Sequence, residues 1–455
     1  MSSDEPSSND VYNIDISKGL GNVRVITKGL SRIKPSAISH EISRVKDAEN
    51  VEELFLLLDD THQRLEKLSL FKSTESFVTR GLNEGDVDVI FTFEEKSALF
   101  TVGANVNSKA EAGVEIKGEL PGVLGSVNTL TVNANTTGGS NNEFSGSFYI
   151  PRISALPNFT GLFQLFTSHT DLNAYSSYST RSKGLRFTLS NLNFRHRFIW
   201  EASVRDVYPT FNEQFKASEA ILKNSGCSLK NSLSYTYSLD NLSGDAIPFD
   251  GELTKFRIES GIPGGDCQFL KFDYSMLLAR FIKEKFIGHL SMSVGYLHPL
   301  GSYSPTSSIL DRFHFTGASG TSSTFRGFRF HGVGPHDWGG LYNVEKGEWF
   351  KKADHLGGDY FGNIQMSLYY PFNLSNFQSP MAFGFCNIGT LSSLKPGIDL
   401  YAQALKDIRL SVGTGLSMNL SSGCWVEAFV SKALLYAPSD ILSPFQVGLR
   451  FKSGG

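Results

Sequence analysis

From Ser97 onward, apolar side chains alternate with small or polar ones in segment after segment. Leu130, Val132 and Ala134 alternate with threonine and asparagine, and residues 185–190 and 290–296 repeat the pattern. A period of two places one kind of side chain on each face of a strand. These segments cluster near the ~9–11 residues that a tilted transmembrane strand needs, whereas soluble strands average ~5–6. The pattern predicts long strands with one apolar and one polar face.

The number of segments predicts a closed sheet. About sixteen of them fill residues 97–455, a number typical of large membrane barrels, and many are joined by short turns such as Thr137-Gly138-Gly139. Lipid offers no hydrogen-bond partner to an unpaired strand edge, so a sheet in a membrane must close. We therefore expect an all-β transmembrane barrel of about sixteen antiparallel strands over residues 97–455. The alternative is a soluble β-rich protein that buries its apolar face between two sheets.

Residues 20–96 follow a different pattern. Apolar residues from Val51 to Leu68 have helical spacing, and Asn50 with Glu53 resembles a capping box at the start of that helix. Residues 86–95 alternate as a half-buried strand does. This mixture predicts one small α+β domain over residues 20–96. Residues 1–19 are acidic and serine-rich, without the features of a secretory signal, and we expect a polar, disordered tail.

Composition and motifs argue against several functions. A net charge of −3 gives no field that would attract nucleic acid, so no nucleic-acid partner is expected. Gly332-x-Gly334 lacks the strand and helix of a dinucleotide loop, and no nucleophile elbow frames a serine. We expect neither an enzyme nor a cofactor. No metal site is expected either, because the four cysteines form no CxxC motif and have no histidines at ligand spacing: Cys227, Cys267, Cys386 and Cys424.

The connection 313–358 is far longer than a hairpin loop and carries Phe325-Arg326-Gly327-Phe328 between breaker-rich flanks. Phenylalanine rings gain nothing in a solvated loop, so we expect this loop to fold into the barrel. There Arg326 would hydrogen-bond to the inner wall, Gly327 would let the backbone turn, and the rings would pack on small residues of the wall. The alternative is an exposed loop whose rings contact a partner.

Several motifs resemble one known superfamily. FRGF, with Phe313 and Gly320 before it and HGVGP after it, resembles the signature sixth loop of the barrel insertases. That superfamily includes the bacterial barrel assembly machinery and the mitochondrial sorting and assembly machinery. Three further similar segments follow the family order: IPGGDCQFLKFD (262–273), LGGDYFGNIQMSLYYPF (356–372) and FGFCNIG (383–389). Residues 20–96 are similar to a single polypeptide-transport-associated (POTRA) domain, which favours the mitochondrial branch.

The resemblance implies a function. It implies a protein of the mitochondrial outer membrane that assembles and inserts β-barrel precursors, templating client strands at the seam between its first and last strands. The implied partners are barrel precursors, accessory subunits of an assembly complex and membrane lipid. A passive outer-membrane channel, or a pore that transports polypeptides, is the alternative.

The resemblance also implies three groups of functional residues. The sixth-loop motif is Phe325, Arg326, Gly327 and Phe328. The inner-wall candidates are Gly357, Gly358, Asp359, Phe385, Asn387 and Gly389. The seam candidates are Phe100, Gln446, Gly448 and Phe451.

Two departures from the family pattern change these expectations. Asn387 stands where the superfamily often has the acid that pairs with the loop arginine. An amide cannot form a salt bridge, so we expect a hydrogen bond between Arg326 and Asn387. Asp359 is the alternative, anionic partner of Arg326. The last strand has Gln446 and Gly448 of a mitochondrial sorting signal, but Ser453 replaces its second hydrophobe, so that signal is incomplete.

Overall fold

The chain divides into two compact units, which we describe separately. One holds the N-terminal α+β elements together with residues 118–131 and 148–151, and the other holds most of a large sheet. The computed structural model describes residues 19–83, 85–106, 112–138, 141–153, 156, 158–212, 215–244, 247–282, 285–300, 307–315, 324–343, 348–372, 380–394, 399–421 and 424–451. Apart from Gly19, the expected tail therefore lies outside the described residues, as do Gly320 and Ser453.

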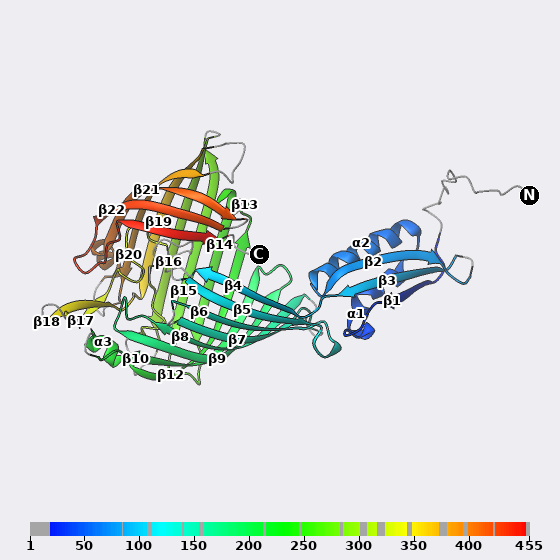
Figure 1. Cartoon of the computed structure of the whole chain (residues 1–455), viewed down its shortest axis with the longest axis horizontal. Coiled ribbons are helices and arrows are strands. Elements are labelled where there is room, and N and C mark those ends of the chain that lie inside the picture. Colours follow the sequence, from blue (N-terminus) through cyan, green and yellow to red (C-terminus); the bar gives the residue numbers. More distant parts are fainter. Residues whose placement is uncertain are drawn as a thin grey trace, which may run out of the picture. The chain divides into compact units, whose positions relative to one another are not determined.

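The N-terminal elements form a three-stranded sheet with helices (Figure 1, blue). They are β1 (Val23–Lys28), α1 (Pro35–Ile42), η1 (Ser43–Asp47), α2 (Val51–Lys67), β2 (Phe71–Arg80) and β3 (Val87–Glu95). β3 is central, parallel to β1 and antiparallel to β2. Asn50 caps α2 by accepting the Glu53 N–H at 2.8 Å, and Glu53 in turn accepts the Glu49 N–H at 2.9 Å. The capping interaction between Asn50 and Glu53 is thus confirmed.

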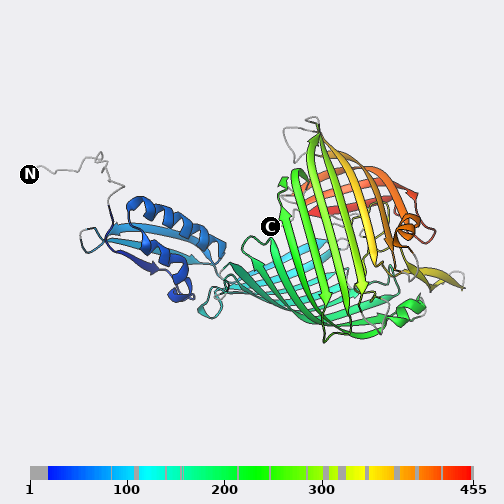
Figure 2. The same ribbon diagram turned by 180° about the vertical axis from the view of Figure 1, so that it is seen from behind.

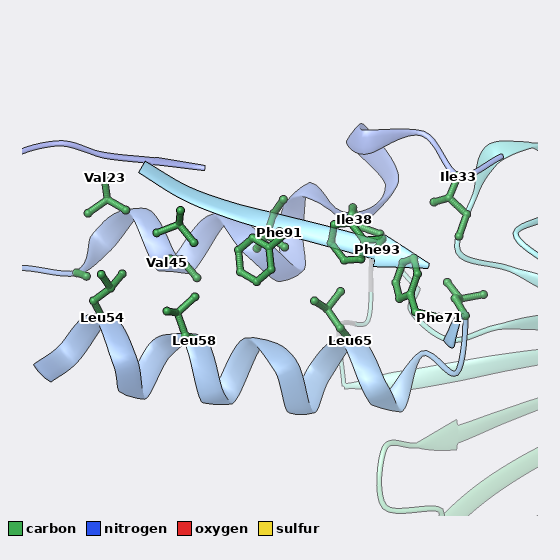
Figure 3. Packing of buried hydrophobic residues seen from close by; sticks show 14 residues of the cluster. Val23, Ile33, Ile38, Val45, Leu54, Leu58, Leu65, Phe71, Phe91 and Phe93 are labelled. Atoms are coloured by element: carbon green, nitrogen blue, oxygen red, sulfur yellow. The ribbon is translucent and has the colours of Figure 1, made fainter. Parts of the chain in front are cut away.

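The core of this unit lies between α2 and the sheet. Leu54, Leu58 and Leu65 project from one face of α2 toward Phe91 and Phe93 of β3 (Figure 3), and all five are buried. Their spacing in the sequence, helical in one segment and alternating in the other, is what brings them to a common face.

A carboxylate holds the start of α1 against the end of β3. Glu95 accepts hydrogen bonds from the backbone N–H groups of Ser31, Arg32 and Ile33, at 3.0, 3.1 and 2.9 Å. Burial alone would raise the pKa of Glu95, but the hydrogen bonds to its charged form outweigh burial and hold the pKa at about 2.

The second unit contributes most of a closed barrel, confirming the predicted architecture (Figures 1 and 2). Among the described residues sixteen main strands close the barrel, with β23 and β4 as neighbours. They are β4 (Leu99–Val106), β5 (Ala112–Pro121), β6 (Thr129–Thr137), β7 (Asn141–Ile150), β8 (Phe159–Asp171), β9 (Tyr178–Asn191), β10 (His196–Pro209), β12 (Gly226–Asp240), β14 (Pro248–Gly261), β15 (Phe269–Ile282), β16 (Phe286–Pro299), β19 (Tyr360–Pro371), β20 (Met381–Ser392), β21 (Ile408–Ser421), β22 (Cys424–Leu435) and β23 (Phe445–Phe451). The two-residue β13 (Ser243–Gly244) adds to the β12–β14 hairpin.

The two faces of the barrel wall differ as the alternation predicts. In β20, Phe383, Phe385 and Asn387 are buried, while the intervening Cys386 and Ile388 are exposed. The exposed face of β19 carries Met366, Leu368 and Tyr370 in the same way. We call the buried face the inner wall and the exposed apolar face the outer wall.

The shorter elements correct one expectation. The connection 313–358 is not loop throughout: β17 (His336–Asn343) and β18 (Glu348–His355) form a hairpin that pairs with β11 (Phe215–Lys216). The pair Gly339-Gly340 reads as a strand breaker, but here the missing side chains leave room for backbone and side-chain atoms of Lys216, Trp349 and Asp354. The other short elements are η2 (Val123–Gly125), α3 (Glu219–Lys223) and α4 (Leu400–Lys406).

Within the described part of the chain, no helix has both the length and the apolar character that crossing a bilayer demands.

Candidate functional site

The sixth-loop motif lies against the inner wall. Phe325, Arg326 and Phe328 are at most 1% exposed. The Phe325 ring stacks between those of Phe315 and Phe328, with centroids 4.5 and 5.1 Å apart. The described residues of the motif are therefore packed against the inner wall.

Gly327 and Gly389 permit this close packing. Gly327 has a φ of +92°, in the region that favours glycine, and a Cβ there would lie 3.0 Å from Ser411 Cβ. On the wall, a Cβ at Gly389 would lie 2.9 Å from Cε2 of Phe325. A side chain at either position would force loop and wall apart.

Arg326 makes the strongest contact in the site, with an acid the sequence analysis missed. Its Nη2 lies 2.7 Å from Glu427 Oε2 of β22, and the two side chains are 0% and 2% exposed. Nη1 lies 3.4 Å from Ser367 Oγ. A salt bridge, not a hydrogen bond to Asn387, therefore holds the guanidinium.

Three aromatic rings complete the surroundings of the guanidinium. Its central carbon lies 5.3, 5.2 and 5.5 Å from the ring centroids of Phe383, Phe385 and Phe429. Ring faces attract a cation electrostatically, and more strongly where water is excluded. The predicted wall residue Phe385 is thus one side of an aromatic cage around Arg326.

Asn387 holds the arginine's backbone. Its amide Nδ2 donates to the carbonyl of Arg326 at 3.3 Å, and the Ser411 hydroxyl donates to the same carbonyl at 2.6 Å. The candidate position is therefore at the site, but with a different role from the one expected.

Asp359 belongs to a neighbouring part of the loop system. It accepts hydrogen bonds from the Ser307 hydroxyl and from the Leu394 N–H, and lies 3.6 Å from Arg312 Nε. The candidates Gly357 and Gly358 lie beside it, where Gly358 exchanges two backbone hydrogen bonds with Phe313, both 2.9 Å. These three residues anchor the start of the 313–358 connection to its end.

A seam candidate also contacts the loop. Gln446 of β23 accepts the N–H of Gly327 and donates to the carbonyl of Phe328, both at 3.0 Å. Just before β23, Ser443 donates its N–H to the Gly327 carbonyl at 3.0 Å. The last strand and the loop are thus joined by side-chain and backbone hydrogen bonds.

The remaining seam candidates lie on the two strands expected. Gly448 pairs with Glu427 across β22 and β23, and Phe451 pairs with Cys424. Phe100 lies in β4 and is 70% exposed. The side chain of Phe451 lies outside the described residues.

Comparison with known proteins shows to which family this barrel belongs. Residues 123–425 match the family model for the Omp85 superfamily domain. The chain belongs to the Omp85 superfamily. It is 27% identical over 420 residues to "Sorting and assembly machinery component 50 homolog B" of Xenopus laevis, covering 88% of this chain and 83% of that protein. The human "Sorting and assembly machinery component 50 homolog" is 27% identical over 414 residues, covering 87% and 82%.

A solved bacterial structure has the same fold. BamA of Haemophilus ducreyi, lacking POTRA domains 1–3, superposes with a TM-score of 0.76 at 16% identity, covering 94% of this chain and 84% of that one. The resemblance to the mitochondrial branch is confirmed by the relatives, and the chain is a protein of the mitochondrial outer membrane.

Removing the Gln446 amide should loosen the sixth loop without unfolding the barrel. Gln446→Met keeps the side chain's length but leaves the Gly327 N–H and the Phe328 carbonyl without this partner, which typically costs about 1–3 kcal/mol. We expect faster amide exchange at residues 325–332, measured by hydrogen exchange and mass spectrometry. Gln365→Met is the matched control, because Gln365 lies on the inner wall and bonds to Ser367. Equal exchange in the two variants would contradict this coupling.

Proposed function

We propose that this chain assembles and inserts β-barrel precursors into the mitochondrial outer membrane, and that client strands are templated at the seam between β4 and β23. Membership in Omp85 and similarity to components of a sorting and assembly machinery support the general role in barrel assembly. The templating step is our own extension of it.

The observation that carries the proposal is where the barrel closes. It closes between β4 and β23, the first and last main strands, whereas the other neighbouring main strands follow one another along the chain. The seam strands have no direct turn between them, so strand pairing alone joins them, and we take the seam to be the easiest joint to open. An opened edge offers N–H and C=O groups on which another strand can pair.

The sixth loop supports the same proposal. Its motif is fixed to β22 through Arg326 and Glu427 and to β23 through Gln446. In this proposal, the loop keeps the wall beside the seam in register while clients pair there. Phe325, Arg326, Gly327 and Phe328 position the loop, and Gly448 weakens β23 by supplying no side chain.

The N-terminal α+β elements are the proposed site at which precursors are received. We assign residues 20–96 as a POTRA domain and residues 97–455 as the barrel, with β3 ending at Glu95 and β4 beginning at Leu99. The POTRA domain is the proposed receiver of precursors, and accessory subunits of an assembly complex are the proposed further partners.

A passive channel is the rival function. A channel conducts through its lumen, and nothing in that role requires a seam that opens or a loop tied to the last strand. A pore that transports polypeptides also leads through the lumen. Both rivals predict that clients never contact the seam.

A cross-linking experiment separates these functions. A photoreactive residue replaces Val102 of β4 or Val447 of β23, both exposed, and radiolabelled barrel precursors are imported into mitochondria carrying the variant. We expect precursor cross-links at both positions but not at the control position Ile258 on the outer wall of β14. Equal cross-linking at all three would reject templating at the seam.

A further inference from the structure

The outer wall carries a groove on the face opposite to the one that the sixth loop contacts. Residues paired across neighbouring strands form a row: Arg280 of β15 faces Gly288 of β16, which faces Leu368 of β19, which faces Gly384 of β20. Leu368 is therefore flanked by a glycine on each side. The Ile282 side chain covers Gly288, since a Cβ there would lie 2.6 Å from Ile282 Cδ1, whereas a Cβ at Gly384 would meet nothing closer than 3.9 Å. The open part of the depression therefore lies over Gly384.

The depression is large enough to hold part of a ligand. Its volume is about 500 Å³, and the outer-wall side chains that line it are mostly apolar: Leu278, Ile282, Leu290, Met366 and Leu368, with Cys386. Ligand pockets typically measure ~300–1,000 Å³. Since the outer wall faces lipid, the apolar part of the occupant is drawn from the bilayer.

An exposed ion pair lies at one side of the groove. Arg280 lines the groove, and its Nη1 lies 2.7 Å from Asp250 Oδ1; the two side chains are 54% and 51% exposed. An exposed pair is weak and readily exchanges partners. The groove thus has an apolar floor and, at its edge, one positive and one negative group.

Neighbouring aromatic residues indicate the depth of this site in the membrane. Phe286 of β16 and Tyr370 of β19 lie on the outer wall, with ring centroids 5.4 Å apart, and Tyr370 is 40% exposed. Their row is the next one toward the strand ends from the row of Arg280 and Gly288. Aromatic rings concentrate at the boundary between hydrocarbon and headgroups, and long basic side chains reach toward it. Arg280 is therefore within reach of lipid headgroups.

We propose that this groove binds one zwitterionic glycerophospholipid. Its phosphate contacts Arg280, its ammonium group contacts Asp250, and one acyl chain lies along Leu368 and over Gly384. A zwitterion matches an arginine–aspartate pair in both charges, whereas an anionic headgroup would meet the Asp250 carboxylate. The groove offers this lipid both an apolar floor and a charge pair, so it is held more tightly than the surrounding bilayer lipid.

Native mass spectrometry of the full chain tests the proposal. The protein is released from nanodiscs of equimolar phosphatidylcholine and phosphatidylglycerol, and retained lipids are counted. We expect one retained phosphatidylcholine. Arg280→Gln should reduce its occupancy about tenfold, because a lost charge-assisted contact of about 1.4 kcal/mol changes affinity by that factor.

A groove-filling variant tests the acyl contact without changing charge. Gly384→Leu should also lose the lipid, and its new Cβ meets no heavy atom closer than 3.9 Å, so the wall accepts it. Ala382→Leu is the matched control, two residues along on the same outer face and outside the groove, and should retain the lipid. Folding of every variant is checked by heat-modified migration in gels.

A second measurement uses the native thiol in the groove. With the other cysteines replaced, Cys386 should react slowly with an apolar maleimide in phosphatidylcholine nanodiscs and faster after Arg280→Gln. Retention of phosphatidylglycerol in preference to phosphatidylcholine would overturn the proposal. So would unchanged retention in both Arg280→Gln and Gly384→Leu, or a protein rather than a lipid recovered in the groove. None of these outcomes depends on client assembly.

Discussion

Replacing Arg326 with alanine is expected to destabilise the protein by about 3–5 kcal/mol, the cost of leaving a buried carboxylate without its partner. Glu427 is 2% exposed, and it also accepts a hydrogen bond from the Tyr369 hydroxyl at 3.4 Å. A neutral donor at that distance stabilises a carboxylate charge less than a guanidinium at 2.7 Å does. The free energy of unfolding, from denaturant titration of the purified protein in detergent, measures the loss.

The pair itself need not stabilise the barrel relative to apolar residues. Both ions lost their water on folding, and such pairs can often be exchanged for apolar side chains at little cost. We therefore expect Arg326→Met/Glu427→Leu to be more stable than Arg326→Ala alone, while client assembly stays impaired in both because the loop has lost its fixed position.

A matched ion pair on the same barrel provides the control. Arg186 and Glu201 also lie 2.7 Å apart, but the arginine is 36% exposed. Arg186→Ala should cost no more than about 1 kcal/mol, as exposed pairs do. If Arg326→Ala cost no more than Arg186→Ala, burial would not be what makes the loop contact strong.

A disulfide across the seam is expected to reduce client assembly to background. β4 and β23 are neighbours, and a bond forms where two Cα atoms lie about 4.4–6.8 Å apart. Cysteines are scanned in pairs that share a face of the two strands, beginning with Phe100→Cys and Val447→Cys, both exposed on the outer wall, after Cys227, Cys267, Cys386 and Cys424 have been replaced. Assembly of radiolabelled precursors in isolated mitochondria should fail when the bond is oxidised and return on reduction.

A disulfide elsewhere in the wall shows whether the seam is special. Ile258 of β14 and Phe272 of β15 are register partners away from the seam, so Ile258→Cys/Phe272→Cys should leave assembly unchanged in both redox states. A passive channel should conduct equally with the seam locked or free. Full assembly by the oxidised seam variant would exclude strand templating there.

The sequence predicts the barrel well because the deciding signal is local. Alternation within each segment sets the two faces of a strand, and closure follows from the number of strands and the lack of partners in lipid. The N-terminal capping box is local in the same sense, since Asn50 and Glu53 are three residues apart.

The partner of Arg326 could not be predicted in this way. Glu427 is 101 residues away, and its position opposite the loop depends on the register of several strands. One signal was present nonetheless: Glu427 is the acid within WVEAFV and alternates with Trp425 and Phe429, so it shares their face of β22. The hairpin β17–β18 was not predicted for a different reason. Its glycines resemble strand breakers in the sequence, but in the structure they make room for neighbours that are distant in sequence.

The amide of Gln446 has a consequence for how the protein changes state. Because one side chain of β23 makes two hydrogen bonds to the loop backbone, displacing the strand by more than a few tenths of an ångström breaks both at once. The loop still has Arg326 bound to Glu427 and Ser411 on neighbouring strands, so β23 can leave in one step while the loop stays on the wall. A client would meet a protein with two discrete conformations, and the population of the open one would rise in proportion to how much more tightly the client binds it.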